Sequence, residues 1–266
     1  MKILVLNPFA GQIYEKEHCL KIAGPNTEIV FKDISDVYPL PYVTYIYYRH
    51  FCADGAVDKI VQAEREGYDA TFIACMYDPG LLEAKEIVNI PVVGAFEAST
   101  HYACMMGNTY SIVTVEKKVI PCCWQLAELY GVSKKLVSVR DIGIPANKLY
   151  PEITPSEEII RRTIEVSRDC IEKDGAEVIV PGCTLQSTTL THESLTSSSP
   201  IDKFEELTED IGGPIIDPIL IGLKTAEMMA ELRNKVGIPP VSRVAAWKKP
   251  PEEELRRLRK YYGKDK

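Results

Sequence analysis

The 266-residue chain has the composition of an ordinary globular protein, with 45% hydrophobic and 26% charged residues. Its net charge of −7 argues against nucleic acid or an anionic membrane as a partner, because no stretch of basic residues dominates. No apolar run approaches the roughly 18 residues that a membrane-spanning helix needs. The apolar start of the chain is too short for a signal peptide, so we expect a cytoplasmic protein.

Alternating apolar runs and helix-forming stretches in the first half predict a parallel α/β sheet with helices on both faces. Asp78 and Pro79 suit the N-cap and first residue of a helix that begins at 81. An aromatic loop with two prolines, residues 39–48, is a candidate pocket wall, core segment or interface. Strands are expected at 2–6, 27–33, 67–75 and 89–94, and helices at 12–23, 52–66, 81–88 and 97–106.

The second half repeats this succession of elements. Strands are expected at 110–115, 136–139, 176–181 and 213–217, and helices at 116–130, 156–173 and 217–235. The Ser/Thr-rich segment 186–200 is interpreted as a surface loop, with a flap over the site as the alternative. The charged tail helix 252–262 is expected to be solvated or docked on another subunit.

One motif occurs twice, 108 residues apart. Gly67 is followed by an acid two positions on, by an apolar run, and by Cys75 eight positions on. Gly175 and Cys183 repeat this pattern. The carboxyl ends of strands in an open parallel sheet are where ligands bind. Two thiols at equivalent strand ends therefore predict one reaction centre approached from both sides.

The chemistry expected of this pair is proton transfer. A helix start after each cysteine offers free N–H groups and a positive dipole end, which lower the pKa of a thiol toward neutrality. One thiolate can then remove a Cα proton while the other thiol protonates the opposite face, with the sulfurs about 6–7 Å apart. The enolate oxygen would be bound by main-chain N–H groups and by the hydroxyls of Thr114 and Thr184, and a substrate carbonyl by Asn7.

The other cysteines do not share this context. Cys19, Cys52, Cys104, Cys122, Cys123 and Cys170 are interpreted as small core residues. Reduced thiols are expected, because disulfides are rare in chains without an export signal. There is no C-x-x-C, no paired histidine spacing and no phosphate-binding glycine motif, so we predict neither a metal nor a cofactor.

The sequence resembles the aspartate/glutamate/hydantoin racemase superfamily, above all its hydantoin racemase branch. The likeness extends from residue 1 to about 235. It is carried by the motifs Ile3–Pro8, Glu64–Ala70, Ile73–Cys75, Asp78–Leu81, Pro91–Gly94, Glu97–Ala98, Ser111–Val115, Asp174–Val180, Gly182–Cys183 and Pro214–Asp217. The resemblance implies two Rossmann-like α/β domains with parallel sheets, related by a pseudo-twofold axis, with the active site in the cleft between them. The first would comprise 1–97 plus 215–266 and the second 98–214.

The resemblance also implies a cofactor-independent two-base racemase that often forms homo-oligomers. Cys75 and Cys183 would be the acid/base pair. Ligand oxygens would be held by Asn7, Thr114 and the main chain after each cysteine, so that Met76, Gly182 and Thr184 join the predicted substrate site.

The substrate is predicted from the residues beside the thiols. Apolar Met76 and the aromatic segment 42–48 suit a flat ring with a hydrophobic substituent, which favours a 5-substituted hydantoin. No Arg or Lys adjoins either cysteine to bind a distal carboxylate. The alternatives are an aspartate/glutamate-type racemase, a maleate isomerase or an arylmalonate decarboxylase-like enzyme. Outside catalysis, a small-molecule binding protein with two core cysteines is the remaining hypothesis.

Overall fold

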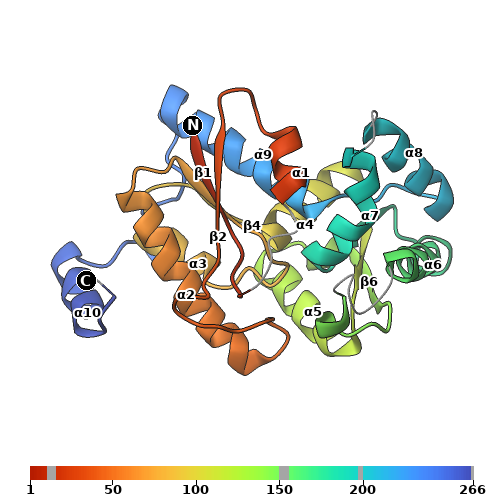
Figure 1. Cartoon of the computed structure of the whole chain (residues 1–266), viewed down its shortest axis with the longest axis horizontal. Helices are drawn as coiled ribbons and strands as arrows, with labels where there is room; N and C mark the ends of the chain where they lie inside the picture. Colours follow the sequence, from red (N-terminus) through yellow and green to blue (C-terminus); the bar gives the residue numbers. More distant parts are fainter. Residues whose placement is uncertain (11–15, 150–155, 197–199, 265–266) are drawn as a thin grey trace.

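The computed structural model describes residues 1–10, 16–149, 156–196 and 200–264, and it contains two parallel sheets (Figure 1). The first sheet has the order β2-β1-β3-β4 and the second the order β6-β5-β7. A parallel bridge between Ile179 and Ile215 places the predicted strand 213–217 beside β7. The strands are β1 Lys2–Leu6, β2 Glu28–Lys32, β3 Ala70–Ile73, β4 Val92–Gly94, β5 Tyr110–Thr114, β6 Leu136–Asp141 and β7 Val178–Pro181. The predicted α/β class with parallel sheets is confirmed.

The two sheets are built on the same plan. In the first, Leu6 of β1 pairs with Ile73 of β3. In the second, Val113 of β5 pairs with Pro181 of β7. Ile73 and Pro181 each follow the repeated glycine by six positions, and both glycines adopt left-handed backbone (φ +78° and +75°). The sequence repeat is thus also a structural repeat.

Helices cover both faces of the first sheet. The helices of the chain are α1 Lys16–Ile22, α2 Ile46–Arg65, α3 Leu81–Ile87, α4 Ala95–Met106, α5 Ile120–Leu129, α6 Ser156–Asp174, α7 Thr184–Thr196, α8 Pro200–Ile211, α9 Pro218–Glu231 and α10 Glu252–Tyr261. One core lies between α2, α3 and the first sheet. A second core joins the other face of that sheet, through α4 and α9, to the second sheet. At the point of closest approach, a Cβ on Gly222 of α9 would lie 2.1 Å from the Phe72 ring.

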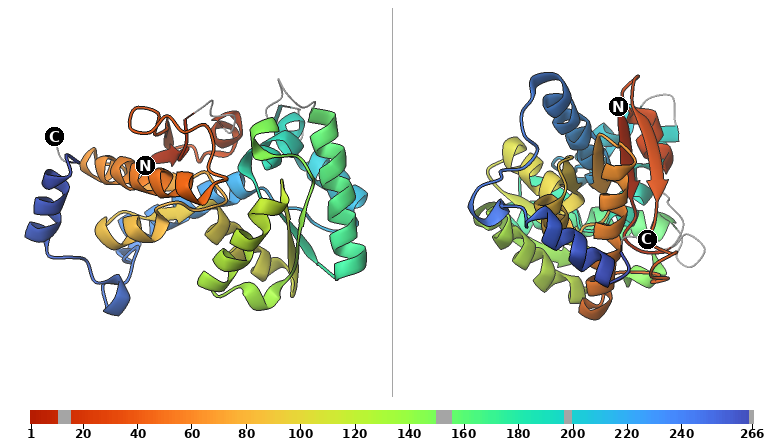
Figure 2. Two further views of the ribbon diagram at one scale, coloured as in Figure 1. Left: turned by 90° about the horizontal axis from the view of Figure 1, so that it is seen from below. Right: turned by 90° about the vertical axis from the view of Figure 1, so that its left-hand side faces the viewer.

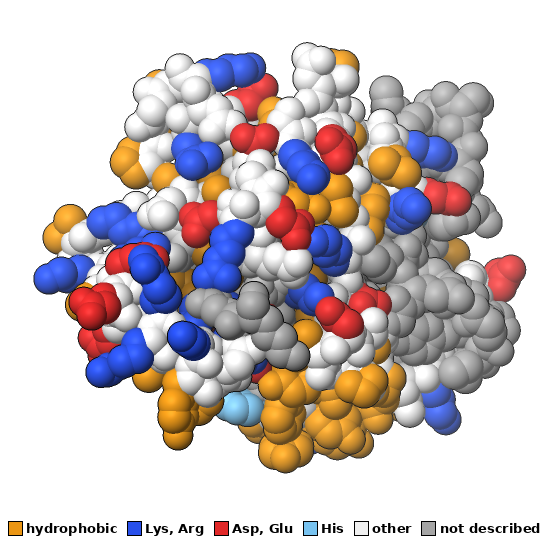
Figure 3. Space-filling view, turned by 60° about the vertical axis from the view of Figure 1, so that its left-hand side comes forward, with side chains coloured by type: hydrophobic (Ala, Val, Ile, Leu, Met, Phe, Trp, Pro, Cys, Tyr) orange, Lys and Arg blue, Asp and Glu red, His pale blue; other side chains and the backbone are white. Residues whose placement is uncertain are grey.

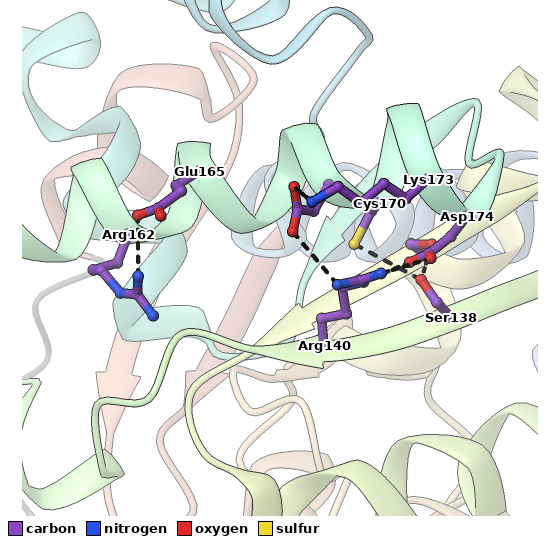
Figure 4. A network of polar contacts seen from close by, with 9 residues as sticks. Ser138, Arg140, Arg162, Glu165, Cys170, Lys173 and Asp174 are labelled. Atoms are coloured by element: carbon purple, nitrogen blue, oxygen red, sulfur yellow. Dashed lines mark hydrogen bonds and ion pairs between the residues drawn. The ribbon is translucent and has the colours of Figure 1, made fainter.

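The second sheet lies between α5 on one side and α6 on the other (Figure 2). Arg140 of β6 forms two hydrogen bonds with Asp174 at the end of α6, at 2.6 and 2.7 Å (Figure 4). The same arginine lies 3.6 Å from Asp169, which Lys173 also contacts at 2.7 Å. This network fastens α6 along the outer strand.

Two predicted features are wrong. The segment 186–200 is helical up to residue 196 in α7 and again from 200 in α8, while 197–199 lie outside the described residues. The hydroxyls of Thr188, Thr189 and Thr191 donate to carbonyls four residues earlier, which lets a Ser/Thr-rich stretch remain helical while buried.

The helix predicted at 52–66 begins at Ile46, so the second part of the aromatic segment 39–48 belongs to α2 and only its first part is a loop. The tail helix α10 is largely exposed to solvent, as predicted, and the end of the tail also contacts α2. Arg259 pairs with Asp58 of α2 at 3.2 Å, and Lys264 contacts the same carboxylate at 2.6 Å. The helix predicted near 12–23 is seen from residue 16, its first part lying outside the described residues. In the described part of the chain, no helix combines the length and the apolar character needed to cross a membrane.

Candidate active site

A cavity of about 540 Å³, counting the part open to solvent, lies at the carboxyl ends of β3 and β7. Both Cys75 and Cys183 line it, together with the predicted site residues Met76, Gly182 and Thr184. The remaining wall consists of Phe9, Tyr42, Val43, Thr44, Tyr77, Val115, Val119, Ala146, Leu149 and Leu185. The fold therefore brings the two repeated thiols to one cavity.

Cys183 stands at a helix start, as predicted. Its carbonyl accepts the N–H of Ser187 at 3.0 Å, so it occupies the N-cap position of α7. The helix has 13 residues, and its N-terminal dipole end faces the cavity wall where the sulfur lies. Cys183 is partly exposed.

Cys75 does not stand at a helix start, and here the prediction is wrong. Helix α3 begins only at Leu81, with Gly80 as its N-cap. Cys75 is buried in the intervening turn, where its sulfur accepts the backbone N–H of Tyr77. Burial raises the pKa of the Cys75 thiol well above its usual range, and the adjacent Cys183 raises it further. The expected lowering of both thiol pKa values thus fails for this thiol.

Asp78 caps a different helix from the one predicted. Its carboxylate accepts the N–H groups of Phe96 at 2.9 Å and Glu97 at 2.8 Å, which are the first free donors of α4. The approach is so close that a Cβ on Gly94 would lie 2.4 Å from the Asp78 carboxyl carbon. Burial raises the pKa of this carboxyl to about 7. Asp78 also adopts left-handed backbone, with φ of +45°. It therefore ties the Cys75 turn to the start of α4.

Asn7 and Thr114 occupy equivalent positions in the two sheets, because Asn7 directly follows β1 and Thr114 is the last residue of β5. Both are buried, and among the described residues neither side chain has a hydrogen-bond partner. Unpaired buried polar groups are uncommon, so two at equivalent strand ends are candidates for binding a ligand's polar atoms. Neither lines the cavity itself. Thr114 lies beneath Gly182, where a Cβ would come within 2.8 Å of the Thr114 Cβ.

Thr184 links the two cysteine-bearing segments. Its hydroxyl donates to the carbonyl of Ala74 at 3.2 Å, directly before Cys75. Because the hydroxyl proton of Thr184 is donated within the protein, it does not bind a substrate oxygen as predicted. The main-chain N–H at the start of α7 remains as a donor.

Only part of the cavity wall could be predicted from the sequence. Tyr42, Val43 and Thr44 belong to the aromatic segment that was a candidate pocket wall, and the structure places them there. Val119 and Leu149 come from separate parts of the second half and belong to no motif, so only the fold brings them to the cavity.

The architecture and the paired thiols of the cleft define a class of protein with two similar α/β halves around one small-molecule cavity. The model of the Asp/Glu/Hydantoin racemase family matches residues 3–226. The chain belongs to this family and, as a member of it, is a racemase.

Among the most similar relatives is the hydantoin racemase of Pseudomonas sp. (strain NS671), which is 28% identical over 256 residues, or 96% of this chain and 94% of that protein. The hydantoin racemase of Rhizobium meliloti is 31% identical over 175 residues, or 66% of each. The structure of allantoin racemase from Klebsiella pneumoniae has a TM-score of 0.78, with 25% identity, and covers 95% of this chain and 94% of that one. These similarities confirm the predicted superfamily and the predicted fold.

Proposed function

We propose that this protein racemises 5-substituted hydantoins by a two-base mechanism in which Cys75 and Cys183 act from opposite faces of the ring. The observation that carries the proposal is their common cavity at equivalent strand ends. The names of the relatives, hydantoin and allantoin racemases, support a cyclic ureide as substrate.

In the proposed reaction, the thiolate of one cysteine takes the proton from C5, and the C–H electron pair moves into the adjacent carbonyl. The resulting enolate oxygen is stabilised by main-chain N–H groups after the cysteines. A ring carbonyl is assigned to Asn7 and Thr114, whose unpaired polar atoms lie behind the cavity wall and become available when the cavity widens on binding. The thiol of the other cysteine then gives its proton to the opposite face of C5. Proton loss and gain balance, and the configuration is inverted without any cofactor.

The cavity wall supports an apolar ring substituent. Among the described residues that line the cavity, none is charged, and most are aliphatic or aromatic. A free aspartate or glutamate would leave its distal carboxylate without a cation there, at a cost of several kcal/mol for an unpaired buried charge. Allantoin would bring a polar ureido group to the same wall.

A substrate panel tests the proposal. We expect the purified protein to abolish the optical rotation of a hydantoin with an alkyl or benzyl group at C5, with a higher kcat/KM than for allantoin. We expect no racemisation of aspartate or glutamate. Racemisation of a free amino acid but of no hydantoin would contradict the proposed substrate, and carbon dioxide release from an arylmalonate would favour the decarboxylase alternative.

We further propose the predicted division into 1–97 plus 215–266 and 98–214. Its support is the return of α9 to the first sheet and of α10 to α2. A homo-oligomer is proposed because the large apolar side chains of Tyr45, Ile46 and Tyr47 at the start of α2 are exposed. Figure 3 shows that hydrophobic side chains also gather along the lower edge of the molecule. Light scattering after size exclusion tests it, and a monomer mass would contradict it. None of the eight cysteines, all of which lie among the described residues, is in a disulfide, and this supports the proposed cytoplasmic location.

A further inference from the structure

Arg49, in the first turn of α2, crosses from the first half of the molecule to the second. Its Nη1 donates to the Sγ of Cys122 on α5 at 2.7 Å. Helix α2 packs on β1 and β3, whereas α5 packs on β6. The contact therefore bridges the elements of the two sheets, beside the cavity whose wall includes Val119, three residues before Cys122.

The partner of this guanidinium is unusual. In the described part of the chain no carboxylate pairs with Arg49, and its Nε is buried without a hydrogen-bond partner. Burial raises the pKa of Cys122, although Arg49 opposes the shift, so the acceptor is a neutral thiol. A hydrogen bond from a guanidinium to a neutral sulfur is weaker than one to a carboxylate. The Arg49–Cys122 bridge is therefore easier to break than an ion pair.

Arg49 also contacts the residue that supports Cys75. Its guanidinium carbon lies 4.8 Å above the ring of Tyr77. Tyr77 lines the cavity, and its backbone N–H donates to the Cys75 sulfur. A second cation–aromatic contact spans the same rim, because Lys118 Nζ lies 5.1 Å from the Tyr45 ring. The Arg49–Tyr77 contact lies within the first half, and the Lys118–Tyr45 contact joins the second half to the first.

We propose that Arg49 is a positioning residue that holds the two halves together beside the cavity through Cys122 and fixes the Tyr77 support of Cys75, so that the cavity opens further to ligands when the Arg49–Cys122 bridge breaks. The closure is independent of the reaction catalysed, whereas its effect on turnover rests on the proposed racemase function.

The test uses the accessibility of Cys75 as a measure of opening. The full-length protein and its variants are treated with limiting iodoacetamide, and the alkylation rate of the Cys75 peptide is followed by mass spectrometry. We expect Cys75 to react about tenfold faster in Arg49→Met and in Cys122→Ala, because each loses a bridge worth about 1–2 kcal/mol. Cys122→Ser keeps an acceptor at the same place and should react close to the wild-type rate.

Arg65→Met, in the last turn of the same helix, is the matched control and should leave the rate unchanged. For turnover, Arg49→Met should raise KM and lower kcat/KM for the hydantoin, with partial recovery in Arg49→Lys. If the bridge were merely structural, both Cys122 variants would have a lower melting temperature, and Cys75 would be alkylated at the same rate in Cys122→Ala and Cys122→Ser. Wild-type alkylation rates in folded Cys122→Ala would overturn the proposal, even if Arg49→Met does not fold. Failure of the wild type to racemise any hydantoin would overturn the proposed function instead and would leave the alkylation result valid.

Discussion

The two cysteine-bearing segments have the same strand register and the same left-handed glycine eight residues before the thiol, and their backbones diverge after it. Cys183 leads directly into α7. Cys75 is followed by a turn with left-handed backbone at Asp78 and Gly80 before α3 begins. The repeat has preserved where each sulfur lies and has changed what surrounds it.

The difference makes the two thiols unequal. Cys75 is 4% exposed, and burial raises its pKa well above the usual range. Cys183 is partly exposed at the positive end of a helix. We therefore propose that Cys183 is the base in the resting protein and that Cys75, which burial keeps protonated, is the acid. One enantiomer then meets the protonation state it needs at once, and the other requires the protons to be exchanged first.

The largest expected effect comes from removing either thiol. Cys75→Ala and Cys183→Ala should each lower racemisation by about 10³-fold, because inversion needs a base and an acid on opposite faces. Cys104→Ser, which changes a cysteine outside the cavity, should retain wild-type activity. Polarimetry of a single hydantoin enantiomer measures all three. Racemisation at the wild-type rate in either alanine variant would show that the removed thiol is not needed for catalysis.

A smaller effect on stability is expected from Asp78, which has no acidic counterpart in the Cys183 segment. Its folded pKa of about 7 lies above the ordinary value of 3.8, so the folded state keeps a proton that the unfolded state has lost. This group therefore stabilises the fold at low pH, and the contribution is lost as pH rises from about 4 to about 7. Urea unfolding across this range should show a decrease on the order of 4 kcal/mol in wild type and a flatter profile in Asp78→Asn. Identical profiles would contradict the buried, protonated carboxyl.

The strands and the placement of both thiols could be predicted because apolar runs and glycine punctuation are local signals. The partner of Asp78 could not be predicted, because the next helix start in sequence, at Leu81, competes with the N–H groups of α4 that only the fold brings close. The prediction of a loop at 186–200 was wrong for a related reason. Its hydroxyls suit a loop as well as a helix, and burial against neighbouring helices decides between them.

Gly182 offers a milder way to alter one half alone. Its equivalent in the first half is Ala74, which fits there. An alanine at 182 would place its Cβ 2.8 Å from that of Thr114. Gly182→Ala should therefore destabilise the fold by about 1–3 kcal/mol and lower kcat/KM, whereas Ala74→Gly should be nearly neutral for activity. Thermal unfolding and racemisation rates compare the two, and equal effects would show that the space around them does not differ.

The smallest expected difference is in thiol reactivity. Near pH 7, iodoacetamide should modify Cys183 at least about tenfold faster than Cys75, because the thiolate is the reactive form. Peptide mapping after brief treatment of the wild type gives both rates in one sample. Faster modification of Cys75 would reverse the assignment of base and acid in the resting protein.

The most direct test of the central claim, that two sulfurs act from opposite faces of one carbon, is the position of solvent deuterium early in the reaction. Wild-type protein is given one hydantoin enantiomer in deuterated water, and the two enantiomers are separated after a few per cent of conversion. We expect the product enantiomer to carry deuterium at C5 while the recovered starting enantiomer keeps its hydrogen. Equal deuteration of both enantiomers from the start would indicate a single base and would contradict the account.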